Sequence, residues 1–261
     1  MQWNPELYQQ FAAERGRPYA DLLSRVQAQQ PRQVVDLGCG DGALTATLAE
    51  RWPEANIHGL DSSADMITAA RQHAAPADSA ACLTFAVGDL ADFSPGPDTD
   101  VILSNAALQW VPDHVALLSA WASSLSSGAC LAWQVPGNFD APAHVLLREV
   151  AERPRWRDVL EGVLRHRGAV AEPVDYAELL LDAGLDAEVW ETTYLHLLTG
   201  PDPVLQWMRG TGLRPVRAAL APDEIADFEA EYGTALRDAY PAGPHGTHLP
   251  FRRILSVGHV P

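Results

Sequence analysis

The segment from Val34 to Gly42 places three alternate glycines directly after a short apolar run. Its order is Val-Val-Asp-Leu-Gly-Cys-Gly-Asp-Gly, and a helix-forming stretch, Ala43 to Arg51, follows at once. Glycines at such a turn permit a tight change of direction and let the backbone approach a ligand closely. A strand, a glycine turn and a helix in this order predict a ligand-binding α/β unit.

Short apolar runs alternate with helical patterns between Gln33 and Trp133, which predicts βαβ units and a parallel sheet. The expected strands are Gln33–Leu37, Ile57–Asp61, Leu83–Val87, Val101–Ser104 and Cys130–Val135. The expected helices between them are Ala43–Arg51, Ser63–His73 and Asp113–Ser124.

The segments on either side of this core follow a different pattern. Two helices, Pro5–Arg15 and Arg17–Gln29, are expected before the first strand. After the core, two cap helices are expected at Val145–Arg167 and Pro203–Tyr240, with a strand between them at Glu188–Leu198. The last apolar run, Arg252–Val260, is expected to be an edge strand. We therefore expect a helical lid at 1–30, a ligand-binding core at 31–138, and cap insertions with the last strands of the same sheet at 139–261.

Three aspartates stand at the ends of successive expected strands, where open α/β sheets bind their ligands. Asp36 would repel a pyrophosphate at the helix N-terminus, but it can orient the ammonium of a methionine moiety, directly or through water. Asp61 can accept both ribose hydroxyls, in a dinucleotide as well as in S-adenosylmethionine. Asp89 can take an adenine amino group while Leu90 packs on the ring. Each aspartate alone could instead cap a helix.

This combination resembles the class I S-adenosylmethionine-dependent methyltransferases from Gln33 to Trp133. The resemblance implies a Rossmann-like α/β fold, with a seven-stranded, mostly parallel sheet, helices on both faces and a helical cap. It also implies S-adenosylmethionine as cofactor and S-adenosylhomocysteine as product. The expected cofactor-binding residues are Asp36, Gly38, Gly40, Asp61, Ser62, Asp89, Leu90, Asn105, Ala106 and Trp110.

Segments outside the cofactor fold are similar to the trans-aconitate 2-methyltransferases. They are Trp3-Asn4-Pro5 with Tyr8, Ser104 to Pro112, Val135 to Asn138, Trp190 to Tyr194, Gly210 to Pro215 and Pro250 to Arg253. This similarity implies methyl transfer to one carboxylate of trans-aconitate, giving a monomethyl ester. A carboxylate with a pKa near ~4 is already ionised at neutral pH. We therefore expect no catalytic base, and alignment of the reactants to provide the rate.

An acceptor with three carboxylates needs cationic partners for the groups that are not methylated. Arg214, set among glycines and a proline, is the first candidate, and Arg252, Arg253, Arg15 and Arg17 are others. For each of these, pairing with surface acids is the alternative. The expected substrate-binding residues are Arg214, Arg252, Tyr194, His196, Trp133 and Asn138, although the aromatic and histidine side chains fit a packed core equally well.

Composition excludes or disfavours several classes of protein function. The net charge of −16 disfavours nucleic-acid substrates. All 18 basic residues are arginine, so the Tyr/Lys pair of short-chain dehydrogenases and the Walker lysine are missing. The histidines show no metal-binding spacing, and the three cysteines are expected to be buried, reduced thiols. No apolar run is long enough for a membrane span. A cytoplasmic location is expected, and the oligomeric state is left open.

Three other functions compete with the leading hypothesis. A methyltransferase acting on another small carboxylic acid or a natural product would share every cofactor motif. A nicotinamide-dependent oxidoreductase is disfavoured by Asp36, by Asp89-Leu90 and by the missing lysine. A non-catalytic S-adenosylmethionine-binding protein could use the same residues as an enzyme.

Overall fold

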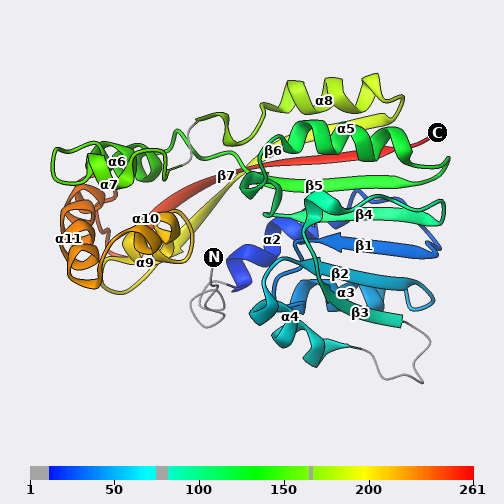
Figure 1. The fold of residues 1–261 in the computed structure, drawn as a ribbon, viewed down its shortest axis with the longest axis horizontal. Helices are drawn as coiled ribbons and strands as arrows, with labels where there is room; N and C mark the ends of the chain where they lie inside the picture. The colour runs from blue at the N-terminus through cyan, green and yellow to red at the C-terminus, as the bar shows by residue number, and fades with distance from the viewer. Residues whose placement is uncertain (1–11, 75–81, 165–166) are drawn as a thin grey trace.

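A seven-stranded sheet forms the centre of the computed structural model, which describes residues 12–74, 82–164 and 167–261 (Figure 1). The strand order is β3-β2-β1-β4-β5-β7-β6. The strands are β1 Gln33–Leu37, β2 Asn56–Asp61, β3 Cys82–Val87, β4 Thr99–Asn105, β5 Cys130–Pro136, β6 Asp186–Leu198 and β7 Thr247–His259. Strands β1 to β5 pair in parallel, and β7 is antiparallel to both β5 and β6. The expected Rossmann-like fold with a mostly parallel sheet is therefore confirmed.

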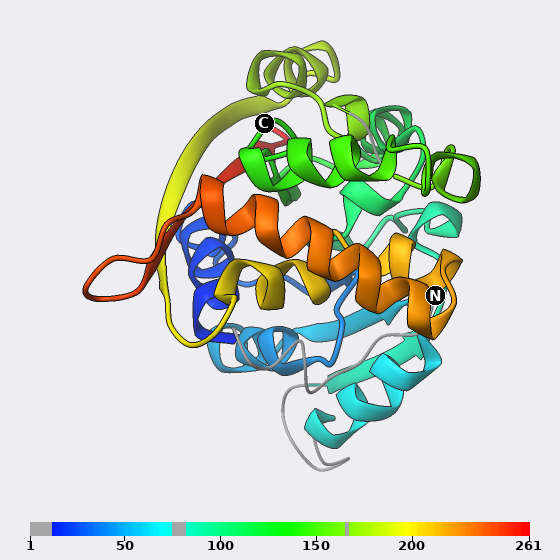
Figure 2. The same ribbon diagram turned by 90° about the vertical axis from the view of Figure 1, so that its left-hand side faces the viewer.

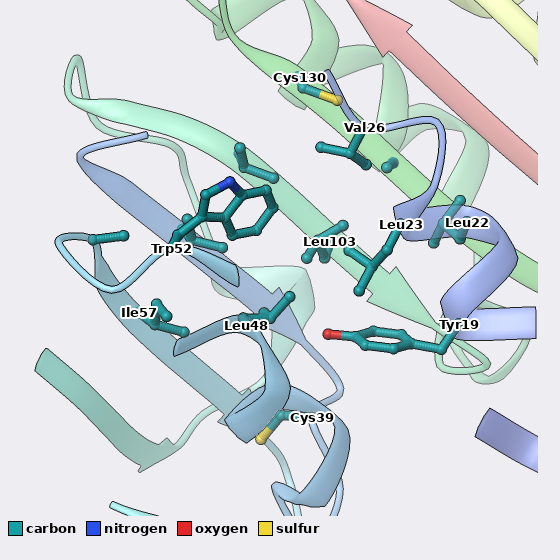
Figure 3. Close-up of a cluster of buried hydrophobic side chains, with 14 of the residues drawn as sticks. Tyr19, Leu22, Leu23, Val26, Cys39, Leu48, Trp52, Ile57, Leu103 and Cys130 are labelled. Atoms are coloured by element: carbon teal, nitrogen blue, oxygen red, sulfur yellow. The ribbon is translucent and has the colours of Figure 1, made fainter. Parts of the chain in front are cut away.

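Helices cover both faces of the sheet, so its central strands are buried on each side. One face carries α2 Ala12–Leu23, α3 Ala43–Arg51 and α4 Ala64–Ala70, and the other carries α5 His114–Ser124 and α8 Pro173–Asp182. Figure 3 shows the first of these two cores, where Tyr19 and Leu23 from α2 pack with Leu48, Trp52 and Leu103. Short 3₁₀ helices lie in the connections at Arg71–His73, Leu90–Asp92, Leu108–Trp110 and Arg167–Ala169.

A second lobe of helices is attached to the long strands β6 and β7, which extend beyond the other five strands of the sheet (Figures 1 and 2). Its helices are α6 Pro142–Ala151, α7 Arg157–Leu160, α9 Pro203–Arg209, α10 Arg214–Ala219 and α11 Pro222–Ala239. The lobe has its own core, in which Trp156, Trp207, Phe228 and Tyr232 are almost fully buried. Phe251 of β7 belongs to this core, so β7 joins the sheet to the lobe.

Several expectations about the flanking segments were wrong. The last strand is not at an edge, because β7 pairs with β5 on one side and β6 on the other. The helix expected at Arg17–Gln29 has other bounds, because α2 continues through Gly16 and ends at Leu23, so that residues 24–29 lie outside it. Helix α8 was not expected, although Pro173 at its first turn and a capping box formed by Glu172 and Asp175 mark its start.

The two long cap helices are also divided. The expected helix Val145–Arg167 is broken between α6 and α7, in a segment that contains Pro154, which cannot continue a helical hydrogen-bond ladder. The expected helix Pro203–Tyr240 forms α9, α10 and α11, because each of the three has its own proline at its first or second position. Cys82 was expected to be buried but is exposed, since β3 is an edge strand, whereas Cys39 and Cys130 are buried.

Candidate active site

A pocket with a cavity volume of about 380 Å³, the larger of two that adjoin at the loop after β4, lies where β1, β2, β3 and β4 end. This is the edge at which open α/β sheets bind ligands. All of the residues expected to bind a cofactor line this pocket, except Asp36. They are Gly38, Gly40, Asp61, Ser62, Asp89, Leu90, Asn105, Ala106 and Trp110.

The glycine turn forms the floor of the larger pocket and needs its glycines for two reasons. Gly38 and Gly40 have φ values of +81° and +59°, a region that residues with a side chain rarely adopt. A Cβ at Gly38 would also lie 2.2 Å from Cβ of Ala107, which is on the facing loop. Gly38 therefore lets two loops from different strands pack together, whereas Gly40 has open space around it.

Asp61 connects the glycine turn to the start of α4. Its Oδ2 accepts a hydrogen bond from the Gly40 N–H at 3.0 Å, and its Oδ1 accepts one from the Ser63 N–H at 2.8 Å. Burial raises the pKa of Asp61, and these two backbone donors oppose the increase. Both carboxylate oxygens retain further lone pairs for a ligand hydroxyl.

Asp89 both begins a 3₁₀ helix and faces the larger pocket. Its Oδ1 accepts the Ala91 N–H at 2.9 Å, and its side chain is exposed at the pocket wall. The capping role considered for this aspartate therefore exists, and it leaves the other carboxylate oxygen available to a ligand.

Asp36 lies behind the glycine turn and is only 3% exposed. The Thr45 hydroxyl donates to its Oδ2 at 2.6 Å, which connects β1 to α3. Burial raises the pKa of Asp36 to about 6, against the effect of the Thr45 hydrogen bond. In the structure Asp36 supports the turn, and direct contact with a cofactor stays a prediction.

The loop after β4 forms the wall between the larger pocket and a smaller one. Ala106 has a φ of +56°, an unfavourable region for alanine. Its N–H donates to the Gln134 carbonyl at 2.9 Å, and its carbonyl accepts from Nε2 of Gln109 at 2.6 Å. Asn105 Oδ1 is buried here and has no hydrogen-bond partner among the described residues.

The smaller pocket has a cavity volume of about 70 Å³ and shares Asn105, Ala106 and Trp110 with the larger one. Its wall also contains Gln134 and Arg253, which are 1% and 6% exposed. Gln134 was not among the expected site residues. The available signal was a glutamine inside a strand that is otherwise apolar from Cys130 to Val135.

The expected acceptor-binding residues are distributed over different parts of the molecule. Asn138 lines the smaller pocket. Arg214 lines the larger one, where burial lowers its pKa and Asp61 opposes this effect, and it lies over the Trp110 ring at 5.7 Å. Arg252 is in neither wall, because it pairs with two glutamates, Glu172 at 2.9 Å and Glu191 at 2.6 Å.

The remaining candidates lie outside both pocket walls. Tyr194 donates a hydrogen bond to Asp21 of helix α2, and His196 stacks on Trp207 with ring centroids 4.8 Å apart. Trp133 is fully buried against Tyr176, on the face of the sheet that carries α5 and α8. Trp3 and Tyr8 lie outside the described residues. Acceptor binding by Tyr194, His196 and Trp133 stays a prediction.

No group of three or more metal-ligating side chains occurs in the described part of the chain. Among the same residues, no helix combines the length and apolar character that a bilayer span requires.

A family model described as a methyltransferase domain matches residues 35–131. The chain is 50% identical to trans-aconitate 2-methyltransferase of Streptomyces avermitilis, over 98% of this chain and 96% of that one. It is 51% identical to the enzyme of the same name from Rhodococcus jostii, over 99% of each chain. Among solved structures, YcgJ from Bacillus subtilis matches with a TM-score of 0.59 at 14% identity, over 92% of this chain and 96% of that one. Geranyl diphosphate C-methyltransferase from Streptomyces coelicolor matches with a TM-score of 0.55 at 13% identity, over 98% and 83%.

Proposed function

Because this chain belongs to the trans-aconitate 2-methyltransferase family, we propose that it methylates one carboxylate of trans-aconitate with S-adenosylmethionine. The products are a monomethyl ester and S-adenosylhomocysteine. The observation that carries this proposal is a pair of adjoining pockets, of which only the larger has acidic side chains among its described lining residues. The larger has acids at the strand ends, and the smaller has a buried guanidinium, with Asn105, Ala106 and Trp110 in the wall between them.

The larger pocket fits S-adenosylmethionine in size and in chemistry. Its volume falls in the range of small-molecule sites, about 300–1,000 Å³. We assign Asp61 to the ribose hydroxyls and Asp89 with Leu90 to the adenine. The buried Oδ1 of Asn105, which has no partner among the described residues, is an acceptor for the ammonium of the methionine moiety. When bound, the cofactor supplies a methyl group activated by a positively charged sulfur.

The protein then has to hold a carboxylate beside that methyl group rather than activate it. A carboxylate with a pKa near ~4 is ionised at neutral pH and is already a nucleophile. Holding two reactants in line can supply an effective molarity of about 10⁵ M or more. The wall formed by Asn105, Ala106 and Trp110 is where the two pockets meet, so we assign it to the alignment of the reacting groups.

Local positive charge is required because the chain as a whole carries a charge of −16 and repels a tricarboxylate. Arg214 at the larger pocket and Arg253 at the smaller one supply it. Both guanidinium groups remain protonated at neutral pH, since arginine stays charged even where burial lowers its pKa.

The test is transfer of labelled methyl from S-adenosylmethionine to trans-aconitate, with cis-aconitate, isocitrate and citrate as alternative acceptors. We expect trans-aconitate to have the highest kcat/KM and the product to be a monomethyl ester by mass. Calorimetry with S-adenosylhomocysteine measures cofactor binding separately. Cofactor binding without transfer to any of the four acids would remove the acceptor assignment and leave the methyltransferase fold in place.

A further inference from the structure

Three buried amide and guanidinium side chains gather in the wall of the smaller pocket. Gln134 comes from β5, Asn138 follows the end of that strand, and Arg253 comes from β7, with 1%, 7% and 6% of their surface exposed. Residue Pro136 of β5 pairs with Arg253 of β7 in the sheet register, which sets the two strands side by side at this point.

Two atoms of this group, both on amide side chains, have no hydrogen-bond partner among the described residues. Arg253 donates from Nη1 to Oε1 of Gln134 at 3.3 Å, so the carbonyl end of the glutamine is engaged by the guanidinium. Nε2 of Gln134, its donor end, is buried with no partner among the described residues, and so is Oδ1 of Asn138. Buried polar atoms without partners are rare and costly in folded proteins, so a polar ligand is the expected partner.

The alternation of side chains along β7 separates Arg253 from Arg252. Arg252 points to the face that carries α8 and pairs with two acids, Glu172 and Glu191. Arg253 points to the opposite face, where its guanidinium lies 4.4 Å from the centre of the Phe251 ring. Two consecutive arginines therefore have different environments, and only the second of them lines a pocket among the described residues.

The charge of the smaller pocket favours an anion. None of the described residues that line it is an aspartate or glutamate, in a chain with 34 acidic residues. The Gln134 carbonyl already accepts from Arg253, so these two side chains present N–H donors to a ligand, and a carboxylate offers only acceptors. A cavity of about 70 Å³ has room for a carboxylate, since about 15 Å³ of such volume holds one water molecule.

We propose that Arg253 and Gln134 form the subsite for an acceptor carboxylate that is not methylated. This inference rests on the proposed function, because the acceptor must present a second carboxylate while its first one faces the larger pocket. Gln134 is a positioning and binding residue here, since Arg253 fixes its carbonyl end and thereby leaves its Nε2 as the donor. The subsite sets specificity for acids with two or more carboxylates.

The first experiment measures binding of trans-aconitate by calorimetry in the presence of S-adenosylhomocysteine, so that no turnover is needed. Arg253→Met keeps the length of the side chain and its contact with Phe251 but removes the charge and the donors. Losing hydrogen bonds between charged groups predicts a dissociation constant about 10 to 100 times higher. Arg253→Lys retains the positive charge but lacks the paired N–H donors of a guanidinium, so its dissociation constant should lie between those of the wild type and Arg253→Met.

Gln134→Glu is the second variant and keeps the shape of the side chain. It places a negative charge in the subsite, so affinity for trans-aconitate should fall sharply while affinity for S-adenosylhomocysteine stays unchanged. Thermal unfolding of each variant, and its affinity for S-adenosylhomocysteine, report whether the fold is retained. Arg237→Gln is the matched control, because Arg237 is more than half exposed and pairs with Asp202 in the helical lobe.

A second readout compares acceptors that each lack one carboxylate of trans-aconitate and keep its double-bond geometry, namely mesaconate and cis-glutaconate. The wild-type protein should bind at least one of them more weakly than trans-aconitate, and Arg253→Met should lose most of that difference. A purely structural role of Arg253 would not remove this discrimination.

Three outcomes would contradict the subsite. Folded Arg253→Met and Gln134→Glu proteins with wild-type affinity and KM for trans-aconitate would overturn it while the proposed function stands. A larger effect of Arg252→Gln than of Arg253→Met would assign the carboxylate to the other face. Wild-type protein that neither binds nor methylates trans-aconitate would overturn both the subsite and the proposed function.

Discussion

Replacing Gly38 with alanine tests how the glycine turn closes the larger pocket. The substitution has two costs that the structure separates. A left-handed backbone costs an L-residue about 1–2 kcal/mol, and the φ of Gly38 is +81°. The new Cβ would also lie 2.2 Å from Cβ of Ala107, so one of the two loops has to move. Overpacking of this kind costs about 1–3 kcal/mol.

Gly40→Ala is the matched control, because Gly40 has a similar φ of +59° and nothing within 4 Å of a new Cβ. It should show the backbone cost alone, reduced by about 0.4–1 kcal/mol because alanine restricts the unfolded chain. Gly38→Ala has the same backbone terms and the contact with Ala107. The free energy of unfolding should therefore be lower in Gly38→Ala than in Gly40→Ala by about 1–3 kcal/mol.

A double-mutant cycle isolates the contact between the loops. Ala107→Gly removes the methyl group that the new Cβ would meet, so Gly38→Ala with Ala107→Gly should recover the steric part of the loss. Urea unfolding gives each free energy, and calorimetry gives the affinity for S-adenosylhomocysteine, since both residues line the larger pocket. Equal stability of Gly38→Ala and Gly40→Ala, or no recovery in the double variant, would refute this account of the turn.

Two further predictions concern the aspartates. Asp61→Asn should weaken S-adenosylhomocysteine binding by about 1.5–3 kcal/mol, because the side chain that accepts from the Gly40 and Ser63 N–H groups loses its charge. Unchanged affinity in calorimetry would contradict the assignment of Asp61 to the ribose hydroxyls. Burial raises the pKa of Asp36 in the folded protein from 3.8 to about 6, so the folded state holds this proton more tightly than the unfolded chain does. The stability that results is fully present below about pH 4 and is lost as the pH rises through 6. The Asp36→Asn variant cannot ionise at this position, and its stability relative to wild type should rise by about 2 to 3 kcal/mol between pH 4 and pH 7. Parallel pH profiles for the two proteins in urea unfolding would show that Asp36 is not buried as a titrating group.

The strand and helix that flank the glycine turn could be predicted to the residue, because local signals determine them. Strand β1 and helix α3 have the expected bounds, and the glycines between them mark the turn. The position of β7 could not be predicted in this way, since it depends on pairing with two strands that are distant in the chain. Hydrophobic pattern identifies a strand, but it does not reveal the neighbours of that strand.

The same difference separates the two halves of the candidate site. Asp61 and Asp89 could be expected at one edge because parallel strands end at the same edge of a sheet. Arg252 and Arg253 are adjacent in sequence, and successive side chains of a strand point to opposite faces of the sheet. Which of the two reaches the pocket depends on the register of β7 against β5. The sequence does not carry this information in any local motif.

The position of β7 inside the sheet has a consequence for the order of folding. In the part of the chain that the structure describes, β6 pairs only with β7, and β7 is the last of the seven strands in chain order. During synthesis β6 and the helices before it therefore emerge without the strand that connects them to the sheet. Pairs such as Cys130 with His259 are far apart in sequence, and closing such long loops slows folding. We expect the helical lobe and this half of the sheet to form together, after the βαβ units of the first five strands.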